Sequence, residues 1–277
     1  MRALILVASL ALCLAQNPPS FRTEVRLINV GFTARDSRGV PIKDLTKDDV
    51  EIIDDGASQP IAFFARSDEL PLALGLLADV SGSQEPFIKR HKRDVRDFLK
   101  SVLRPADRAF LLCFGNRLRL ASDFSATAND IIDGLKVFED HPSELPILGP
   151  RREIRLLGTA FYDAIFYSVT EKLNTAERAR KGLIVFSDGE DNSSSHHMLD
   201  AIETAQRENV PLYSIRYTDV KHGELNARNK YGISVMERIA RETGGMDFDA
   251  QRTDLKSAFK AIGEELRSSY ELAYHAN

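Results

Sequence analysis

The chain has 277 residues, of which 43% are hydrophobic and 28% are charged, and its formal net charge is −4 at pH 7. These proportions suit one medium α/β domain with a small additional unit, and they exclude a disordered, collagen-like or coiled-coil chain. The mild acidity gives no electrostatic footprint for nucleic acid or for an anionic membrane surface, so we expect neither as a partner.

The N-terminus is typical of an export signal. Arg2 precedes an apolar run, and Cys13 and Ala15 place small residues at the −3 and −1 positions of a cleavage site. The run is too short to span a bilayer, and a lipoprotein signal would need a small residue where Leu12 stands. We therefore predict a signal peptide over residues 1–15, export to the periplasm or the extracellular space, and no membrane insertion.

Residues 24–66 are predicted to form a small β-rich unit. Its segments are an alternating strand at 24–33, a short helical turn capped by Thr46, a strand at 50–53, a turn at 54–56 and a strand at 61–65. Cleavage at residue 15 would leave Cys113 as the only cysteine, and we expect it to be a buried core residue without a disulfide.

A second pattern, over residues 71–268, alternates strands with amphipathic helices. Continuous apolar runs indicate strands that are buried on both faces of a parallel sheet, at 72–78 and 183–186, and further strands are predicted at 109–114 and 212–217. Shorter strands are predicted at 117–120 and 246–248, and helices at 87–103, 127–137, 160–173, 197–208, 235–242 and 253–267. The predicted fold class is α/β, with a doubly wound, Rossmann-like, mainly parallel sheet flanked by helices. Residues 269–277 are predicted to form a C-terminal strand or tail.

Oxygen-bearing side chains follow the predicted buried strands. Asp79, Ser81 and Ser83 come directly after the strand at 72–78, and Asp188 follows the strand at 183–186. Thr159 opens a helix between them. In a doubly wound sheet, ligands bind outside the carboxyl ends of the strands, so these side chains are expected at one edge. Two carboxylates and three hydroxyls suit a hard cation such as Mg²⁺ rather than zinc or copper.

These five positions resemble the metal-ion-dependent adhesion site (MIDAS) of von Willebrand factor A (VWFA) domains. The resemblance implies that Ser81, Ser83 and Thr159 coordinate Mg²⁺ or Mn²⁺, and that Asp79 and Asp188 bind the ion directly or through water. Residues 40–50, 54–56 and 265–270 also look like the VWFA-related secreted proteins of acidobacteria. That wider resemblance implies an architecture and export rather than a particular ligand.

Each candidate also has a plainer structural interpretation. Asp79, Ser81 and Ser83 are also residues that cap helices and form turns, although the full set of five argues against that reading. Glu190 and Asp191 are interpreted as an acidic turn, His196 and His197 as exposed polar surface, and Asp163 as a stabiliser of its own helix N-terminus. Arg151, Arg152 and Arg155 either guide an acidic partner or form a solvated basic loop.

The sequence therefore predicts an exported, non-enzymatic module that binds a protein partner through an acidic side chain and a divalent cation. One alternative is a structural scaffold in a cell-envelope assembly. Another is a Mg²⁺-dependent phosphoesterase that uses Asp79, but Ser81 stands where such enzymes need a second carboxylate, and there is no Walker glycine loop. The oligomeric state, and whether the small unit closes over the site, are left open by the sequence.

Overall fold

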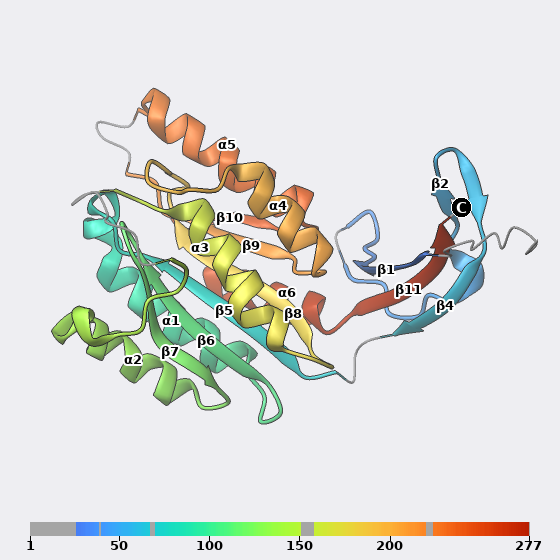
Figure 1. Cartoon of the computed structure of the whole chain (residues 1–277), viewed down its shortest axis with the longest axis horizontal. Coiled ribbons are helices and arrows are strands. Elements are labelled where there is room, and N and C mark those ends of the chain that lie inside the picture. The colour runs from blue at the N-terminus through green and yellow to red at the C-terminus, as the bar shows by residue number, and fades with distance from the viewer. Residues whose placement is uncertain (1–25, 39, 67–69, 151–157, 220–223, 277) are drawn as a thin grey trace, which may run out of the picture.

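The computed structural model describes residues 26–38, 40–66, 70–150, 158–219 and 224–276 (Figure 1). The predicted signal peptide at 1–15 lies outside these residues, as do Arg151, Arg152 and Arg155. Cys113 is fully buried and unpaired, as predicted.

Within the described residues, the larger sheet has six strands in the order β10-β9-β8-β5-β6-β7. Their bounds are β5 (Leu72–Asp79), β6 (Arg108–Phe114), β7 (Leu118–Ser125), β8 (Arg180–Ser187), β9 (Leu212–Arg216) and β10 (Asp247–Asp249). All neighbouring pairs are parallel except β6 and β7. The predicted α/β fold with a mainly parallel, doubly wound sheet is confirmed. The edge strand β7 extends five residues beyond its predicted end. Its last residues include polar side chains, as is usual on an edge strand, and the prediction had ended the strand where the apolar residues became less frequent.

Helices cover both faces of this sheet (Figure 1). The helices α1 (Ile88–Val102), α2 (Ala128–Asp140) and α6 (Leu255–Leu266) pack on one face, and α3 (Phe161–Tyr167), α4 (Met198–Arg207) and α5 (Ala227–Glu242) pack on the other. Alternate side chains of β5 serve the two cores, with Leu74 and Leu76 on the α1 side and Ala73 and Leu77 on the α3 side. A strand with no solvent-facing side chain has a continuously apolar sequence. This is why the position of β5 could be predicted.

Two helices differ from the prediction. The predicted helix at 160–173 is α-helical only to Tyr167, and it continues as a π-helical turn at Ser168–Lys172 and a 3₁₀ turn at Leu173–Thr175. Helix α5 begins eight residues before its predicted start. Its first turns are mostly polar and lack an apolar period, and the helix is started instead by Asn226, whose side chain accepts the N–H of Asn229.

The small sheet is built from both ends of the chain. Its order is β1-β11-β4, with β1 (Arg26–Thr33), β4 (Ile61–Arg66) and the C-terminal strand β11 (Ser269–Ala276) in the middle. Both pairings are antiparallel. The predicted turn at 54–56 joins β2 (Ile52–Asp54) to an unpredicted short strand, β3 (Ala57–Gln59), and not to β4.

The small unit docks at the amino ends of the parallel strands. The N–H of Gly31 donates to Oδ1 of Asn209, which lies just before β9, at 3.1 Å. Arg35 forms an ion pair with Glu265 in the last turn of α6, and the Thr33 hydroxyl also reaches Glu265, at 3.4 Å. The carboxyl ends of β5 and β8 lie at the opposite edge (Figure 1). The small unit therefore does not close over the candidate site.

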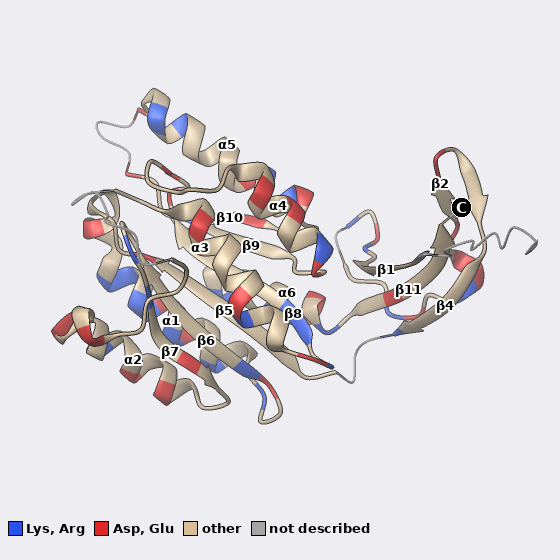
Figure 2. Cartoon of the chain, viewed as in Figure 1, with Lys and Arg blue, Asp and Glu red and all other residues tan. Residues whose placement is uncertain are grey.

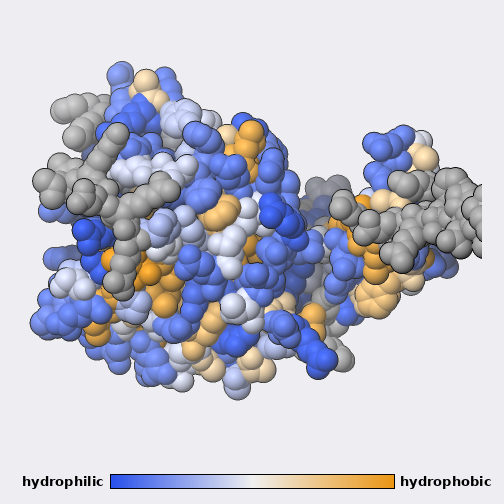
Figure 3. All heavy atoms as spheres, viewed as in Figure 1, coloured by the Kyte–Doolittle hydropathy of each residue, from blue (hydrophilic) through white to orange (hydrophobic). Residues whose placement is uncertain are grey.

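The surface mixes charges and carries some apolar area. Lys and Arg are interspersed with Asp and Glu along the helices, with no face of a single sign in this view (Figure 2). Apolar surface is visible on the small unit (Figure 3), where Leu27, Ile53 and Phe63 have exposed fractions of 50%, 66% and 50%.

Candidate functional site

Asp79 is the last residue of β5 and is fully buried. Its Oδ1 accepts the backbone N–H of Ser81 at 2.9 Å, and its Oδ2 accepts the hydroxyl of Ser187 at 2.6 Å. The carboxylate is therefore fixed both by its own loop and by the end of the neighbouring strand β8. Ser187 was not identified from the sequence, because a serine at the end of an apolar strand carries no distinctive signal.

Ser81 and Ser83 place their hydroxyl oxygens 3.2 Å apart. Ser81 stands at the N-cap of the 3₁₀ helix Gly82–Phe87, but its side chain makes no capping hydrogen bond. Ser81 therefore occupies the cap position that the plainer interpretation gave it, but its hydroxyl does not act as a cap. Its hydroxyl contacts the hydroxyl of Ser83 instead of the helix backbone, so the two oxygens lie side by side.

Asp188 follows β8 and is 5% exposed. Its Oδ2 accepts the side-chain amide of Gln84 at 2.7 Å, and its Oδ1 accepts the N–H of Glu190 at 3.1 Å. Gln84 is fully buried and also donates to the carbonyl of Tyr217 at 3.2 Å. Gln84 thus connects the loop after β5 with the loop after β8, a role that the sequence did not reveal.

Thr159 is 3% exposed and is held by the loop that follows β8. Its N–H donates to Oδ1 of Asn192 at 2.8 Å, and its carbonyl accepts the N–H of Asn192 at 3.0 Å. The next residue, Ala160, donates its N–H to the carbonyl of Gly115 at 2.8 Å. A Cβ on Gly115 would lie 3.7 Å from the Cα of Ser81, so the Thr159 segment runs beside the Ser81 loop. The predicted segments thus meet at one edge of the sheet.

The two carboxylates of the site lack a compensating charge. Burial and, to a lesser extent, the negative charge of Asp188 together raise the pKa of Asp79 to about 7, although hydrogen bonds from Ser187 and Ser81 oppose this rise. In the described part of the chain, neither aspartate forms an ion pair with a Lys or Arg. His91 contacts the carbonyl of Asp79 through Nδ1 at 3.1 Å, but burial lowers the pKa of His91 to about 4 and keeps it neutral. A buried pair of like charges without a cationic side chain fits a site for a cation.

The donor set fits a hard divalent ion. The five predicted residues offer only carboxylate and hydroxyl oxygens, which are the atoms that Mg²⁺ and Mn²⁺ prefer. No group of three or more His, Cys, Asp or Glu side chains suited to a metal is found among the described residues, so a site here depends on the hydroxyls.

The interpretation of Glu190 and Asp191 as a simple acidic turn is wrong. Glu190 is 7% exposed and forms an ion pair with Arg228 of α5 at 2.5 Å. Asp191 accepts the N–H of Phe161 at 3.0 Å and the hydroxyl of Ser194 at 2.5 Å. These two residues attach the loop after β8 to helices on either side of it.

Asp163 lies in the first turn of α3, where its charge was predicted to stabilise the helix N-terminus. It also accepts the backbone N–H of His196 at 3.0 Å and contacts its Nδ1 at 2.7 Å, so it anchors the loop after β8 as well. The His196 ring stacks on Phe166 with centroids 3.7 Å apart. It is therefore part of the packing and not free polar surface. The exposed His197 caps α4, in a capping box with Asp200.

A cavity of about 380 Å³ opens beside Ser81 and is lined by Gly82, Gly158, Arg117 and Arg119 among others. Arg119 donates to the carbonyl of Leu145 at 2.9 Å and so belongs to the wall. Ser81 therefore borders a cavity whose wall also contains two arginines.

The sequence matches no protein-family profile and no curated protein. Solved structures do share the fold. An aerotolerance-related membrane protein from Bacteroides fragilis aligns with a TM-score of 0.51 and 16% identity, over 70% of this chain and 98% of that protein. BatB from Bacteroides thetaiotaomicron aligns with a TM-score of 0.51 and 17% identity, over 70% and 97%.

A third similar structure is proximal thread matrix protein 1 from the mussel byssus, described with a zinc-occupied MIDAS motif. It aligns with a TM-score of 0.50 and 15% identity, over 78% of this chain and 50% of that protein. Identities this low carry information about the fold alone. The α/β domain of this chain has a fold of the von Willebrand factor A type.

Proposed function

We propose that this chain is an exported, non-enzymatic module that captures an acidic group of a protein partner through a divalent cation, Mg²⁺ or Mn²⁺. Ser81, Ser83 and Thr159 would hold the ion with their hydroxyls, and Asp79 and Asp188 would hold it directly or through water. A cation held largely by neutral hydroxyls keeps positive charge, and this charge attracts a carboxylate.

One observation carries the proposal: two buried carboxylates, Asp79 and Asp188, lie close enough for their charges to interact, without a basic partner among the described residues. Each is oriented by a hydrogen bond from another loop, from Ser187 and from Gln84. Such positioning is what a metal site needs from the residues around its ligands. The mussel protein of the same fold, whose MIDAS motif holds zinc, supports a divalent ion here.

The acidic nature of the partner is supported by the cavity beside Ser81. Arg117 lines it, and a partner carboxylate that approached Ser81 would pass this guanidinium. Opposite charge on the two surfaces favours fast and selective association.

Export rests on the predicted signal peptide at residues 1–15. In the described ranges, no helix has both the length and the apolar character needed to cross a membrane.

The test is isothermal titration of Mg²⁺ and of Mn²⁺ into the purified protein and into the double variant Asp79→Asn, Ser81→Ala. We expect saturable binding of one ion, weakened about 100-fold or more in the variant, because both a charge and a ligand oxygen are lost. The matched control is Ser101→Ala, Asp133→Asn, which changes the same residue types on exposed helix surfaces. Absence of binding to either ion would overturn the proposal.

A scaffold role is the second candidate, and one feature favours it: both oxygens of Asp79 already have hydrogen-bond partners within the protein. In that role a metal would only stabilise the loops. Chelation would then lower the melting temperature and leave the affinity for a protein partner unchanged, whereas the proposed adhesion requires that affinity to fall.

A further inference from the structure

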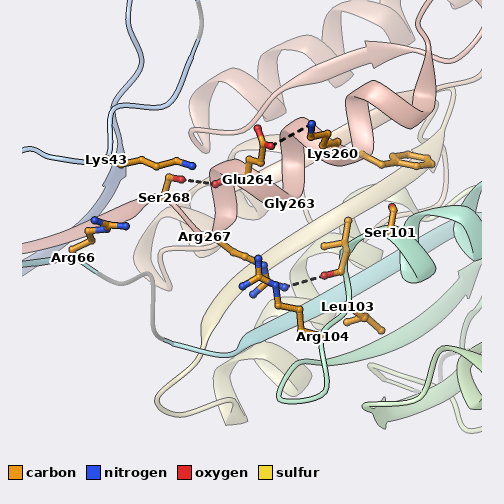
Figure 4. A pocket seen from close by; sticks show the side chains of 12 residues that line it. Lys43, Arg66, Ser101, Leu103, Arg104, Lys260, Gly263, Glu264, Arg267 and Ser268 are labelled. Carbon is orange, nitrogen blue, oxygen red and sulfur yellow. Dashed lines mark hydrogen bonds and ion pairs between the residues drawn. The ribbon is translucent and has the colours of Figure 1, made fainter.

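A second cavity, of about 350 Å³, lies between the small unit and the α/β domain (Figure 4). The ends of α1 and α6 form one side of it, and Lys43 and Arg66 of the small unit form the other. Because the small unit docks at the amino ends of the sheet strands, this cavity is remote from Asp79.

Basic side chains dominate the walls of this cavity. Five of them line it, together with one acidic side chain, Glu264. The five are Lys43, Arg66, Arg104, Lys260 and Arg267. The chain as a whole is acidic, with a formal charge of −4, so this local excess of positive charge is opposite to the average. Such a concave basic surface raises the local concentration of anions.

Part of this charge is already balanced within the protein. Arg267 forms an ion pair with the buried Asp107, and Lys260 lies 3.9 Å from Glu264. In the described part of the chain, Lys43 and the guanidinium of Arg104 have no acidic side chain within ion-pair distance. These two cations face the cavity from opposite units (Figure 4).

A simpler explanation is that the basic residues compensate the C-terminal carbonyls of α1 and α6. The structure identifies the side-chain donors to two of those carbonyls, and only one of these donors is basic. Arg267 donates to the carbonyl of Val102 at 2.9 Å, and the Ser268 hydroxyl donates to that of Glu264 at 2.7 Å. Lys43 belongs to neither helix. Helix-end compensation therefore accounts for Arg267 but not for the remaining positive charge.

We infer that this cavity is a binding site for a compact anion with two or more phosphate or carboxylate groups. Lysine and arginine bind both kinds of oxyanion, and the planar guanidinium does so with two parallel hydrogen bonds. Val102, Leu103 and Phe259 also line the cavity, but Val102 and Phe259 are buried, so the contacts with a ligand would be mainly polar. An anion held between Lys43 and Arg104 contacts both units and so ties the small sheet to the α/β domain. This site does not depend on the proposed metal site.

The experiment is isothermal titration of tripolyphosphate and of citrate into the protein after removal of metal ions by dialysis. Removing metal matters because both anions also bind divalent cations. The variant is Lys43→Gln, Arg104→Gln, and both residues are exposed, so the fold is retained. The matched control is Arg252→Gln, Lys256→Gln, which removes two exposed charges near the opposite end of α6.

We expect one-to-one binding of at least one of the two anions, weakened about tenfold or more in the cavity variant and unchanged in the control. Bound anion should also raise the melting temperature of the unmodified protein. Absence of binding to both anions would overturn the inference. An equal loss in the two variants would also overturn it, because the binding would then reflect general surface charge.

Discussion

The hydroxyl of Ser187 donates a 2.6 Å hydrogen bond to Oδ2 of Asp79, and both residues are fully buried. This bond connects the last residues of two neighbouring strands, β8 and β5, beneath the loops that carry the candidate ligands. It gives a buried carboxylate a fixed orientation, and no Lys or Arg of the described ranges forms an ion pair with that carboxylate. The geometry of the site therefore depends on a residue that is not one of its predicted ligands.

Replacing Ser187 with alanine is expected to destabilise the protein by about 2 kcal/mol, because a buried carboxylate loses a hydrogen-bond donor. The free energy of unfolding in urea measures this loss. Ser234→Ala is the control, since Ser234 is exposed on α5 and bonds only the carbonyl of Tyr231 among the described residues. Equal stabilities of the two variants would show that the Ser187–Asp79 bond contributes nothing.

Gly232→Ala is expected to destabilise the protein although the residue lies inside α5. In an ordinary helix this change stabilises by about 1 kcal/mol. Here the added Cβ would lie 2.3 Å from the carbonyl oxygen of Asp188, and the resulting shift is expected to cost about 1–3 kcal/mol. Because the shift moves Asp188, the affinity for Mg²⁺ should fall as well.

Gly263→Ala provides the matched control for that experiment. Gly263 lies inside α6, and a Cβ there would make only an ordinary contact, 3.4 Å from the Val102 side chain. This variant should be as stable as the unmodified protein or more stable, as judged by its melting temperature. If both glycine variants gained stability, the close approach of α5 to Asp188 would be contradicted.

The sequence predicted the central sheet well because burial determines its pattern. Strands such as β5, with both faces covered, must be apolar throughout, and Asp79 and Asp188 stand out at the points where such runs end. The parallel topology was enough to predict that the segments with Asp79, Thr159 and Asp188 lie at one edge of the sheet. It was not enough to predict the hydrogen bonds between these segments, because those bonds depend on side-chain orientations.

The small unit was harder to predict because alternation identifies a strand but not its partner. The tail was expected to be a strand, yet nothing local in β11 indicates that it lies between β1 and β4, more than 200 residues earlier in the chain. The supporting roles of Gln84 and Asn192 were not predicted for a similar reason. Their amides act on Asp188 and Thr159 through contacts that span more than 30 positions.

Asn192→Ala is expected to weaken Mg²⁺ or Mn²⁺ binding by about 10- to 100-fold with little effect on folding. Asn192 is exposed, so its removal leaves no cavity, but its Oδ1 accepts the N–H of Thr159 and holds that segment in place. Isothermal titration measures the affinity, and Asn174→Ala, at an exposed position of the 3₁₀ turn at Leu173–Thr175, is the control. Unchanged affinity in Asn192→Ala would mean that Thr159 does not need this support.

Asp107→Asn is expected to reduce stability in a manner that depends on pH. Asp107 is 1% exposed, forms an ion pair with Arg267, and accepts the N–H groups of Leu72 at 2.8 Å and of Arg104 at 2.7 Å. Burial raises the pKa of Asp107, but the contacts with Arg267 and the two N–H groups outweigh it, so the pKa lies below its ordinary value of 3.8. Removing the charge leaves Arg267 without its partner, which is expected to cost about 3 kcal/mol at pH 7.

The sign of the pH effect follows from the lowered pKa of Asp107. The stabilisation by this carboxylate is fully present above pH 3.8, the unfolded-state value, and it is lost as the pH falls through the lower value of the folded state. The difference in unfolding free energy between the unmodified protein and Asp107→Asn should therefore be constant from pH 7 to about pH 5 and shrink at lower pH. Urea unfolding at several pH values measures it. A difference that stayed the same down to the acid-unfolding limit would show that the bonds to Asp107 do not depend on its charge.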